Sequence, residues 1–252
     1  MTCEAGALFA NAGGDHDLPG WQGEIYQGSG QSSPSEPRDE SQWIETVSWE
    51  PRAFVYHNFL SKEECLHLIH LAAPTMEKSS VVDNKTGKSV ASRIRTSSGT
   101  FLNRGHDKVV KDIEERLASF SMIPADHGEG LQVLHYEVGQ QYEAHYDFFH
   151  DKFNVKNGGQ RIATVLMYLA DVEDGGETVF PQGKPITPQT GSWSPCAQQG
   201  VAVKPKRGDA MVFWSLKTDG NTDNKSLHAS CPVIKGNKWT ATKWLRVNKY
   251  TI

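Results

Sequence analysis

The sequence lacks the features that mark membrane-spanning, signal-bearing and nucleic-acid-binding proteins. No run of about 18 apolar residues occurs in it, so we expect no membrane-spanning helix within this chain. No segment has the pattern of a secretory signal or of an N-terminal anchor. The 26 basic and 30 acidic side chains give a net charge of −4, which argues against a nucleic-acid partner. A peptide or a small molecule is therefore the expected partner.

Cysteine is scarce, and its spacing does not match the common zinc-binding patterns. The four cysteines are Cys3, Cys65, Cys196 and Cys231, with no CxxC pair among them. Cys65 falls on the apolar stripe of a predicted helix and is expected in the core. Cys196 and Cys231 either form a disulfide in an oxidising compartment or remain two buried thiols, and the sequence leaves both alternatives open.

The chain divides into a polar tail and one folded domain. Residues 1–42 are rich in Gly, Ser, Pro, Asp and Gln and have no apolar period, so we expect a disordered N-terminal tail. Residues 43–252 are long enough to bury a sizeable core and are predicted to form a single domain.

Two helices are expected in the first half of the domain. Ser61 and Glu64 form a capping box at the start of the first helix, and Pro74 ends it. The second helix is predicted at residues 107–119 from its apolar period. Residues 79–99, between the helices, form a long polar connection that is either a lid over a site or a surface loop.

Short strands separated by Gly- and Pro-containing turns dominate the rest of the domain. A nearly continuous apolar run at residues 162–169 predicts a buried central strand. The other expected strands cover residues 43–49, 53–56, 131–136, 142–147, 177–180, 200–204, 210–214 and 239–247, with one more opening at His228. The pattern favours a mainly β domain with flanking helices (α+β), arranged as a β-sandwich or jelly roll.

The tripeptide His145-Tyr146-Asp147 is the strongest indication of chemistry in the sequence. On a β-strand, residues two apart place their side chains on the same face. His228 opens a later strand, and Lys238 follows at a distance that can place it on the neighbouring antiparallel strand. Two histidines and one carboxylate can bind one face of an Fe(II) ion and leave open positions for O2 and an oxidisable cosubstrate. The lysine would pair with the anionic far end of that cosubstrate, so the set predicts an oxygen-using iron enzyme.

The remaining histidines are not expected to bind the metal. His150 lies three positions after Asp147, so strand alternation places it on the opposite face. His135, on a predicted strand, is expected in the core.

Beyond these residues, the sequence resembles a known enzyme family. His145, Asp147, His228 and Lys238 match the iron(II)/2-oxoglutarate-dependent dioxygenases, and the chain more narrowly resembles the catalytic domain of plant and algal prolyl 4-hydroxylases. The longer matching blocks are WEPRA (49–53), RTSSG (95–99), GGETVFP (175–181) and KWTATKW (238–244), and the resemblance covers roughly residues 43–250. It implies a double-stranded β-helix (jelly roll) core.

The resemblance also implies roles for individual residues. His145, Asp147 and His228 would bind Fe(II), and Lys238 would pair with the C5 carboxylate of 2-oxoglutarate. Two further residues would help to hold the cosubstrate, namely Tyr136 and Thr178. Four would contact or line the peptide groove, namely Tyr142, Arg161, Trp244 and Glu129. From the residues alone, core packing for Tyr142 and Trp244 and a surface ion pair for Arg161 would be the simpler interpretations.

The implied reaction is that of a procollagen-proline-type prolyl 4-hydroxylase. It hydroxylates C4 of peptidyl proline in proline-rich, hydroxyproline-rich-glycoprotein-like proteins with Fe(II), 2-oxoglutarate and O2, and it releases succinate and CO2. The family also implies L-ascorbate as a cofactor and the lumen of the endoplasmic reticulum or Golgi as the location. The chain departs from the family where Arg246 replaces a frequent histidine and Ala229 replaces a glycine, and where the usual N-terminal hydrophobic anchor is not seen.

Two other functions remain open from the sequence. The protein could be a 2-oxoglutarate oxygenase that acts on lysine, a nucleic-acid base or a small metabolite, although the low positive charge argues against a nucleic acid. It could also be a non-catalytic binding module that has kept the fold. The intact metal-ligand set argues against such a module, because a decayed site should have lost a ligand.

Overall fold

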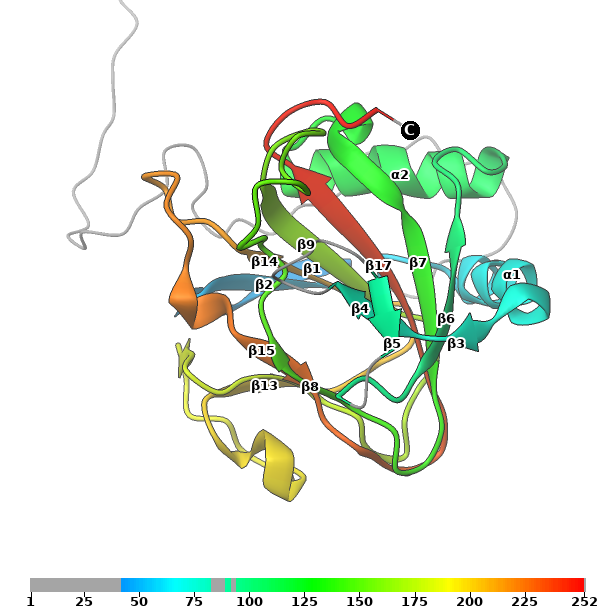
Figure 1. Ribbon diagram of the computed structural model, residues 1–252. Helices are drawn as coiled ribbons and strands as arrows, with labels where there is room; N and C mark the ends of the chain where they lie inside the picture. The colour runs from blue at the N-terminus through cyan, green and yellow to red at the C-terminus, as the bar shows by residue number, and fades with distance from the viewer. Residues whose placement is uncertain (1–41, 83–88, 92–93, 252) are drawn as a thin grey trace, which may run out of the picture.

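Two antiparallel sheets form the body of the protein (Figure 1), and side chains from both sheets line one pocket. The computed structural model describes residues 42–82, 89–91 and 94–251. The larger sheet has nine strands in the order β12-β1-β2-β14-β9-β17-β7-β6-β3. In that order they are Lys184–Pro185, Trp43–Glu50, Arg52–His57, Ala210–Trp214, Arg161–Tyr168, Lys238–Arg246, Gly128–Tyr136, Ser98–Leu102 and Glu77–Lys78.

The smaller sheet has four strands in the order β13-β11-β15-β8, which are Val201–Val203, Thr178–Phe180, His228–Ser230 and Tyr142–His145. Two short ribbons pair β10 (Asp174–Gly175) with β16 (Val233–Lys235), and β4 (Ser80–Val82) with β5 (Ser89–Ala91). The α-helices are α1 (Lys62–Ala72) and α2 (Lys108–Ser121). Four 3-10 turns complete the described elements, at Ala73–Thr75, Ala125–His127, Pro195–Gln198 and Asn224–Ser226. Two facing sheets of this kind confirm the predicted mainly β jelly-roll fold with flanking helices.

Local capping signals fix where both α-helices begin. The Ser61 hydroxyl accepts the backbone N–H of Glu64, and the Glu64 carboxylate accepts the N–H of Ser61, which completes the predicted capping box. The Asp107 carboxylate accepts the N–H of Val110 at the start of α2. None of the helices in the described ranges is long and apolar enough to cross a bilayer.

The two faces of the larger sheet bury different partners. One face packs against the helices, where Val165 and Met167 of β9 contact a cluster that includes Leu68 of α1 and Ile113 of α2. On the opposite face, Tyr168 packs with Phe180 and Phe213. Alternate residues of β9 and β17 therefore point either into a helix-covered core or toward the smaller sheet. The residues that point toward the smaller sheet are available to build a site between the sheets.

Several expectations about the site region were wrong in detail. Strand β8 ends at His145, so Asp147 lies in a bend just beyond it and not on the strand. Lys238 begins β17 of the larger sheet, whereas His228 begins β15 of the smaller one, so their strands are not neighbours. Sheet membership depends on long-range pairing, which spacing along the chain does not determine.

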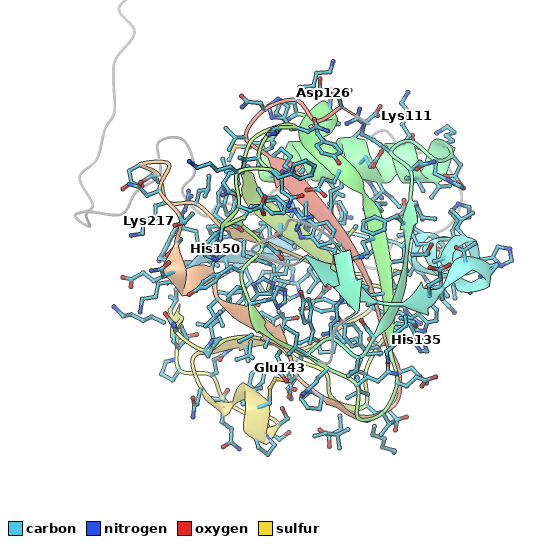
Figure 2. The ribbon with its side chains drawn as sticks, viewed as in Figure 1. Lys111, Asp126, His135, Glu143, His150 and Lys217 are labelled. Carbon is cyan, nitrogen blue, oxygen red and sulfur yellow. A yellow bond between two sulfur atoms is a disulfide. The ribbon has the colours of Figure 1, made fainter. Side chains whose placement is uncertain are left out.

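His135 is not a core residue. It is half-buried at the lower end of β7 (Figure 2), where its ring stacks on Trp239 at 4.2 Å and its Nε2 atom lies 3.2 Å from Asn237 Oδ1. The expected tail at residues 1–42 falls almost wholly outside the described residues, and so do residues 83–88 and 92–93 of the polar connection interpreted as either a lid or a surface loop.

Candidate metal centre and its pocket

The three predicted metal ligands converge at the edge of the smaller sheet. His145 closes β8 and His228 opens β15, and the two residues are paired across these strands. Asp147 reaches them from the bend, with 3.6 Å between His145 Nε2 and Asp147 Oδ1, and 3.7 Å between His228 Nε2 and Asp147 Oδ2. This is the only such group of potential ligands in the part of the chain that the structure describes.

Backbone carbonyls orient both imidazoles toward the centre. His145 Nδ1 lies 2.8 Å from the carbonyl of Glu143, and His228 Nδ1 lies 2.9 Å from the carbonyl of Ser226. A carbonyl only accepts, so each Nδ1 must carry the proton and each Nε2 must present its lone pair. The second ring nitrogen of a metal-binding histidine is usually held in this way.

The charge states of two ligands also suit a divalent cation. Burial lowers the pKa of His145 to about 3, and the neighbouring His228 acts in the same direction, so the imidazole is neutral. Burial would raise the pKa of Asp147, but His228, His145 and Arg161 outweigh it and hold the pKa at about 2. A neutral nitrogen donor and an ionised carboxylate form the donor set that non-haem Fe(II) accepts, with open positions on its other face.

A buried lysine lines the same pocket. Lys238 is 1% exposed, and its Nζ atom donates to Ser230 Oγ at 2.7 Å. Burial lowers the pKa of Lys238 to about 7, with a partial offset from Glu177. The lowered pKa means that no ionised partner in the structure fully compensates this ammonium. An anionic ligand that extends from the metal toward Lys238 would supply that partner.

Tyr136 and Thr178, the residues predicted to help hold the cosubstrate, line the pocket, and both are almost fully buried. Thr178 accepts a hydrogen bond from Tyr168 at 2.9 Å, and burial raises the pKa of Tyr136, which keeps its hydroxyl protonated. Two other lining residues, Thr240 and Trp244, have buried polar atoms (Oγ1 and Nε1) with no hydrogen-bond partner among the described residues. Polar atoms left in this state indicate that a polar ligand belongs in the pocket.

Two of the predicted groove residues, Tyr142 and Trp244, line the pocket, and Arg161 and Glu129 lie beside it. The Tyr142 ring stacks on His145 with 3.6 Å between ring centroids. The Arg161 guanidinium lies 3.7 Å from the centroid of Trp244 and pairs with both carboxylate oxygens of Glu129, at 2.7 and 2.9 Å. Burial would lower the pKa of Arg161, but Glu129 outweighs it and raises the pKa. Arg161 is thus part of a semi-buried network and not of an ordinary surface ion pair.

Several site residues were missed by sequence reasoning. Arg95 lines the pocket 4.8 Å from the centroid of Tyr142 and donates to Gln132 at 2.8 Å. Thr164 of β9 donates to Asp147. Phe101 of β6 is 58% exposed and lies 6.3 Å from Trp244, centroid to centroid. Arg95 was available as a signal, because it opens the RTSSG block, whereas nothing in the sequence singles out Thr164 or Phe101.

His150, labelled in Figure 2, is not among the three residues that converge as potential metal ligands. It is exposed, and its ring contacts are with Tyr146 and Phe148.

A jelly roll that presents two histidines, one aspartate and a buried lysine in one pocket defines a 2OG-Fe(II) oxygenase. In agreement, a family model described as the 2OG-Fe(II) oxygenase superfamily matches residues 131–246.

Relatives narrow this class further. The chain is 58% identical over 247 residues to "Probable prolyl 4-hydroxylase 10" of Arabidopsis thaliana, covering 96% of this chain and 84% of that protein. It is 58% identical over 231 residues to "Prolyl 4-hydroxylase 5" of the same plant, covering 90% and 79%. The crystal structure of the viral collagen prolyl hydroxylase from Paramecium bursaria Chlorella virus-1, a 2OG complex, superposes with a TM-score of 0.57 at 28% identity, covering 77% of this chain and 95% of that one. The chain belongs to the prolyl 4-hydroxylase family.

Proposed function

We propose that this protein is a peptidyl-prolyl 4-hydroxylase that acts on proline-rich proteins. The observation that carries the proposal is the pairing of one metal site, formed by His145, Asp147 and His228, with the buried ammonium of Lys238 in the same pocket. Relatives that are 58% identical over most of their length bear the prolyl 4-hydroxylase name. Fe(II), 2-oxoglutarate and O2 would together supply the oxidation that places one oxygen atom on C4 of proline and the other in succinate, with release of CO2.

The chain's own residues would bind and orient the reactants. His145, Asp147 and His228 would hold Fe(II), and the carbonyl-fixed Nδ1 protons would keep both imidazoles in the binding tautomer. Lys238 would pair with the C5 carboxylate of 2-oxoglutarate, with help from Tyr136 and Thr178.

The substrate would lie across the mouth of the pocket. A proline-rich segment favours the polyproline II conformation, which aromatic surfaces bind at a low entropic cost. Tyr142 and Trp244 would provide such surfaces, Arg161 and Glu129 would set the polar edge, and the exposed ring of Phe101 would extend the groove along β6. L-Ascorbate would be needed to restore iron that becomes oxidised without product formation.

A disulfide supports a location for the protein in an oxidising compartment. Cys196 and Cys231 form a disulfide that links the turn at Pro195–Gln198 to the segment following β15. Disulfides persist in oxidising environments, which supports the lumen of the endoplasmic reticulum or Golgi as the location.

Mass spectrometry of a Ser-Pro repeat peptide tests the proposed activity. After incubation with the full chain, Fe(II), 2-oxoglutarate and ascorbate, we expect one added oxygen on proline and an equal amount of succinate. An Asp147→Asn variant and a peptide with alanine in place of proline are the controls. Turnover with lysine-containing or small-molecule substrates alone would replace the proposed substrate, and no turnover with any substrate would support a binding module.

The groove is tested separately with two aromatic positions. Tyr142→Phe keeps the ring on His145, whereas Tyr142→Ala removes it; Phe101→Ala removes an exposed ring outside the pocket lining. We expect Phe101→Ala and Tyr142→Ala to raise the KM for peptide more than the KM for 2-oxoglutarate. An unchanged peptide KM in both would contradict the groove.

A further inference from the structure

Arg246, the last residue of β17, is buried and makes polar contacts in three directions. It is 4% exposed. Its Nε atom donates to Glu129 Oε1 at 2.7 Å, and its Nη1 atom donates to the backbone carbonyls of Asn154 at 2.9 Å and Gly159 at 2.8 Å. Both carbonyls belong to residues 149–159, the segment that follows the metal ligand Asp147 and precedes β9.

This segment packs tightly onto the end of β17. Gly158 and Gly159 both have φ of +77°, and a Cβ added to Gly158 would come within 3.0 Å of Arg246 Cβ and 3.2 Å of Asn248 O. The N–H of Asn248 donates to the carbonyl of Gly158 at 2.8 Å. The left-handed backbone and the close approach both favour glycine here, and they place Gly158 against the Cβ and Cγ atoms of Arg246.

Arg246 is also coupled to Arg161 through two shared partners. Glu129 Oε1 accepts from the Nε atoms of both arginines, at 2.7 Å each. The second shared partner is Phe149. Its ring centroid lies 4.8 Å from the Arg161 guanidinium and 4.6 Å from the Arg246 guanidinium. One carboxylate and one aromatic ring therefore contact both guanidinium groups, and Arg161 in turn lies over Trp244.

The chemistry of the side chain explains why arginine is suited to this place. A guanidinium carries five N–H donors in a rigid plane, so it can serve a carboxylate and two carbonyls at once. A lysine ammonium has three donors at one point, and a neutral imidazole has a single donor. Neither lysine nor neutral histidine can donate at the same time to acceptors that lie along different edges of the guanidinium plane.

We propose that Arg246 is a positioning residue of the peptide groove: it fixes residues 149–159 against β17 and, through Glu129 and Phe149, holds Arg161 over Trp244. The inference rests on the proposed function insofar as the groove binds a proline-rich peptide. Arg246 does not line the pocket around Lys238, so its effect should be confined to the peptide side of the site.

Three variants test this role, Arg246→Lys, Arg246→His and Arg246→Gln. The matched control is Lys249→Gln, which removes a cation three residues further along that is 71% exposed and pairs with Asp126 at 3.3 Å. We expect the Gln variant to raise the peptide KM about tenfold, as for the loss of buried charged hydrogen bonds, with kcat and the 2-oxoglutarate KM within about twofold of the parent. Lys and His should restore the KM only partly, and the control should change nothing.

Hydrogen exchange of residues 149–159 supplies a readout that needs no turnover. We expect faster amide exchange there and at Asn248 in all three Arg246 variants, with α1 unchanged. Unchanged exchange together with an unchanged peptide KM overturns the proposal, and so does an equal rise in both KM values or loss of folding in all three variants. If the parent protein hydroxylates no proline peptide, the proposed function fails, while the exchange data still decide whether Arg246 fixes the segment.

Discussion

Thr164 Oγ1 donates a hydrogen bond to Asp147 Oδ2 across 2.6 Å, and this contact joins the larger sheet to the one proposed metal ligand that lies outside any strand. Because Asp147 lies in a bend, its backbone is not held by strand pairing. The hydrogen bond from Thr164 of β9 therefore fixes the position of its carboxylate. Hydrogen bonds to a ligating carboxylate orient it, and their loss typically weakens metal binding about 10–100-fold.

We therefore predict that Thr164→Val lowers the affinity for Fe(II) about tenfold, since valine keeps the shape but has no donor. Thr164→Ser should remain near the parent because it retains the hydroxyl. Anaerobic titration calorimetry with Fe(II), or with Mn(II) as a probe, measures the effect. Equal affinities for the Val and Ser variants would contradict the role of this hydrogen bond.

Lys238 should make cosubstrate binding depend on pH. Burial lowers its pKa to about 7, so in the free protein the ammonium loses its proton as the pH rises above that value. A bound carboxylate favours the charged form and raises the pKa, so binding at higher pH must take up a proton. We predict that the affinity for 2-oxoglutarate falls by up to about tenfold per pH unit above about pH 7.

Calorimetry in two buffers of different ionisation enthalpy, at about pH 8, reports this proton uptake directly. In a Lys238→Arg variant the guanidinium stays charged, so the proton uptake should disappear even if the affinity is lower. Binding of 2-oxoglutarate without proton uptake in the parent protein would show that Lys238 is already protonated there.

Sequence reasoning succeeded where the signal is local. The capping box of Ser61 and Glu64 was visible within four residues, and the apolar run at 162–169 corresponds to β9, at the centre of the larger sheet. His145 and Asp147 were singled out from a tripeptide, and the structure brings them together with His228, although only His145 lies on the strand.

Sequence reasoning failed where a role depends on pairing across the fold. Lys238 was expected beside His228 on a neighbouring strand, but it reaches the site from the opposite sheet, because nothing in the spacing determines which sheet a strand joins. Thr164 is one of many strand threonines until the bend places Asp147 against it. From the sequence, Arg246 was only a departure from the family pattern. The structure shows the two backbone carbonyls that accept its hydrogen bonds.

The Cys196–Cys231 disulfide should stabilise the site as well as the fold. It spans 35 residues of chain, and the N–H of Cys231 donates to the carbonyl of Glu177 at 2.8 Å, directly after Ser230, the partner of Lys238. We predict that a Cys196→Ser, Cys231→Ser double variant loses about 3 kcal/mol in the free energy of unfolding and shows a higher KM for 2-oxoglutarate.

Denaturant titration of oxidised and reduced protein measures the loss in the free energy of unfolding. A Cys65→Ala variant is the control: this buried thiol takes no part in the disulfide, so the variant should still lose stability when reductant is added. If reduction leaves the midpoint of the parent unchanged, the disulfide contributes nothing under those conditions.

His57 should make the stability of the fold depend on pH through a group that is not among the proposed metal ligands. Its Nδ1 atom lies 2.8 Å from Asp209 Oδ2 and its Nε2 atom 3.1 Å from Glu45 Oε2, while Trp43 stacks on the ring at 4.1 Å. Burial would lower the pKa of His57, but the two carboxylates outweigh it and raise the pKa to about 9. The imidazolium is thus the form that joins β2 to β1 and to the turn before β14.

The direction of the effect follows from proton linkage. A raised folded-state pKa stabilises the protein fully below the unfolded value of about 6.5, and the stabilisation is lost as the pH rises through about 9. We predict that His57→Gln lowers the free energy of unfolding by about 2 kcal/mol at about pH 6.5, a value reduced for solvent screening because Glu45 is half-exposed. The difference in the free energy of unfolding between parent and variant should shrink steadily toward about pH 9.5. His70→Gln, at an exposed position on α1, is the matched control, and its free energy of unfolding should depend on pH as that of the parent does. Denaturant titrations across this range decide the point, because a difference between parent and His57→Gln that stays constant with pH would mean that the histidine is neutral and contributes only packing.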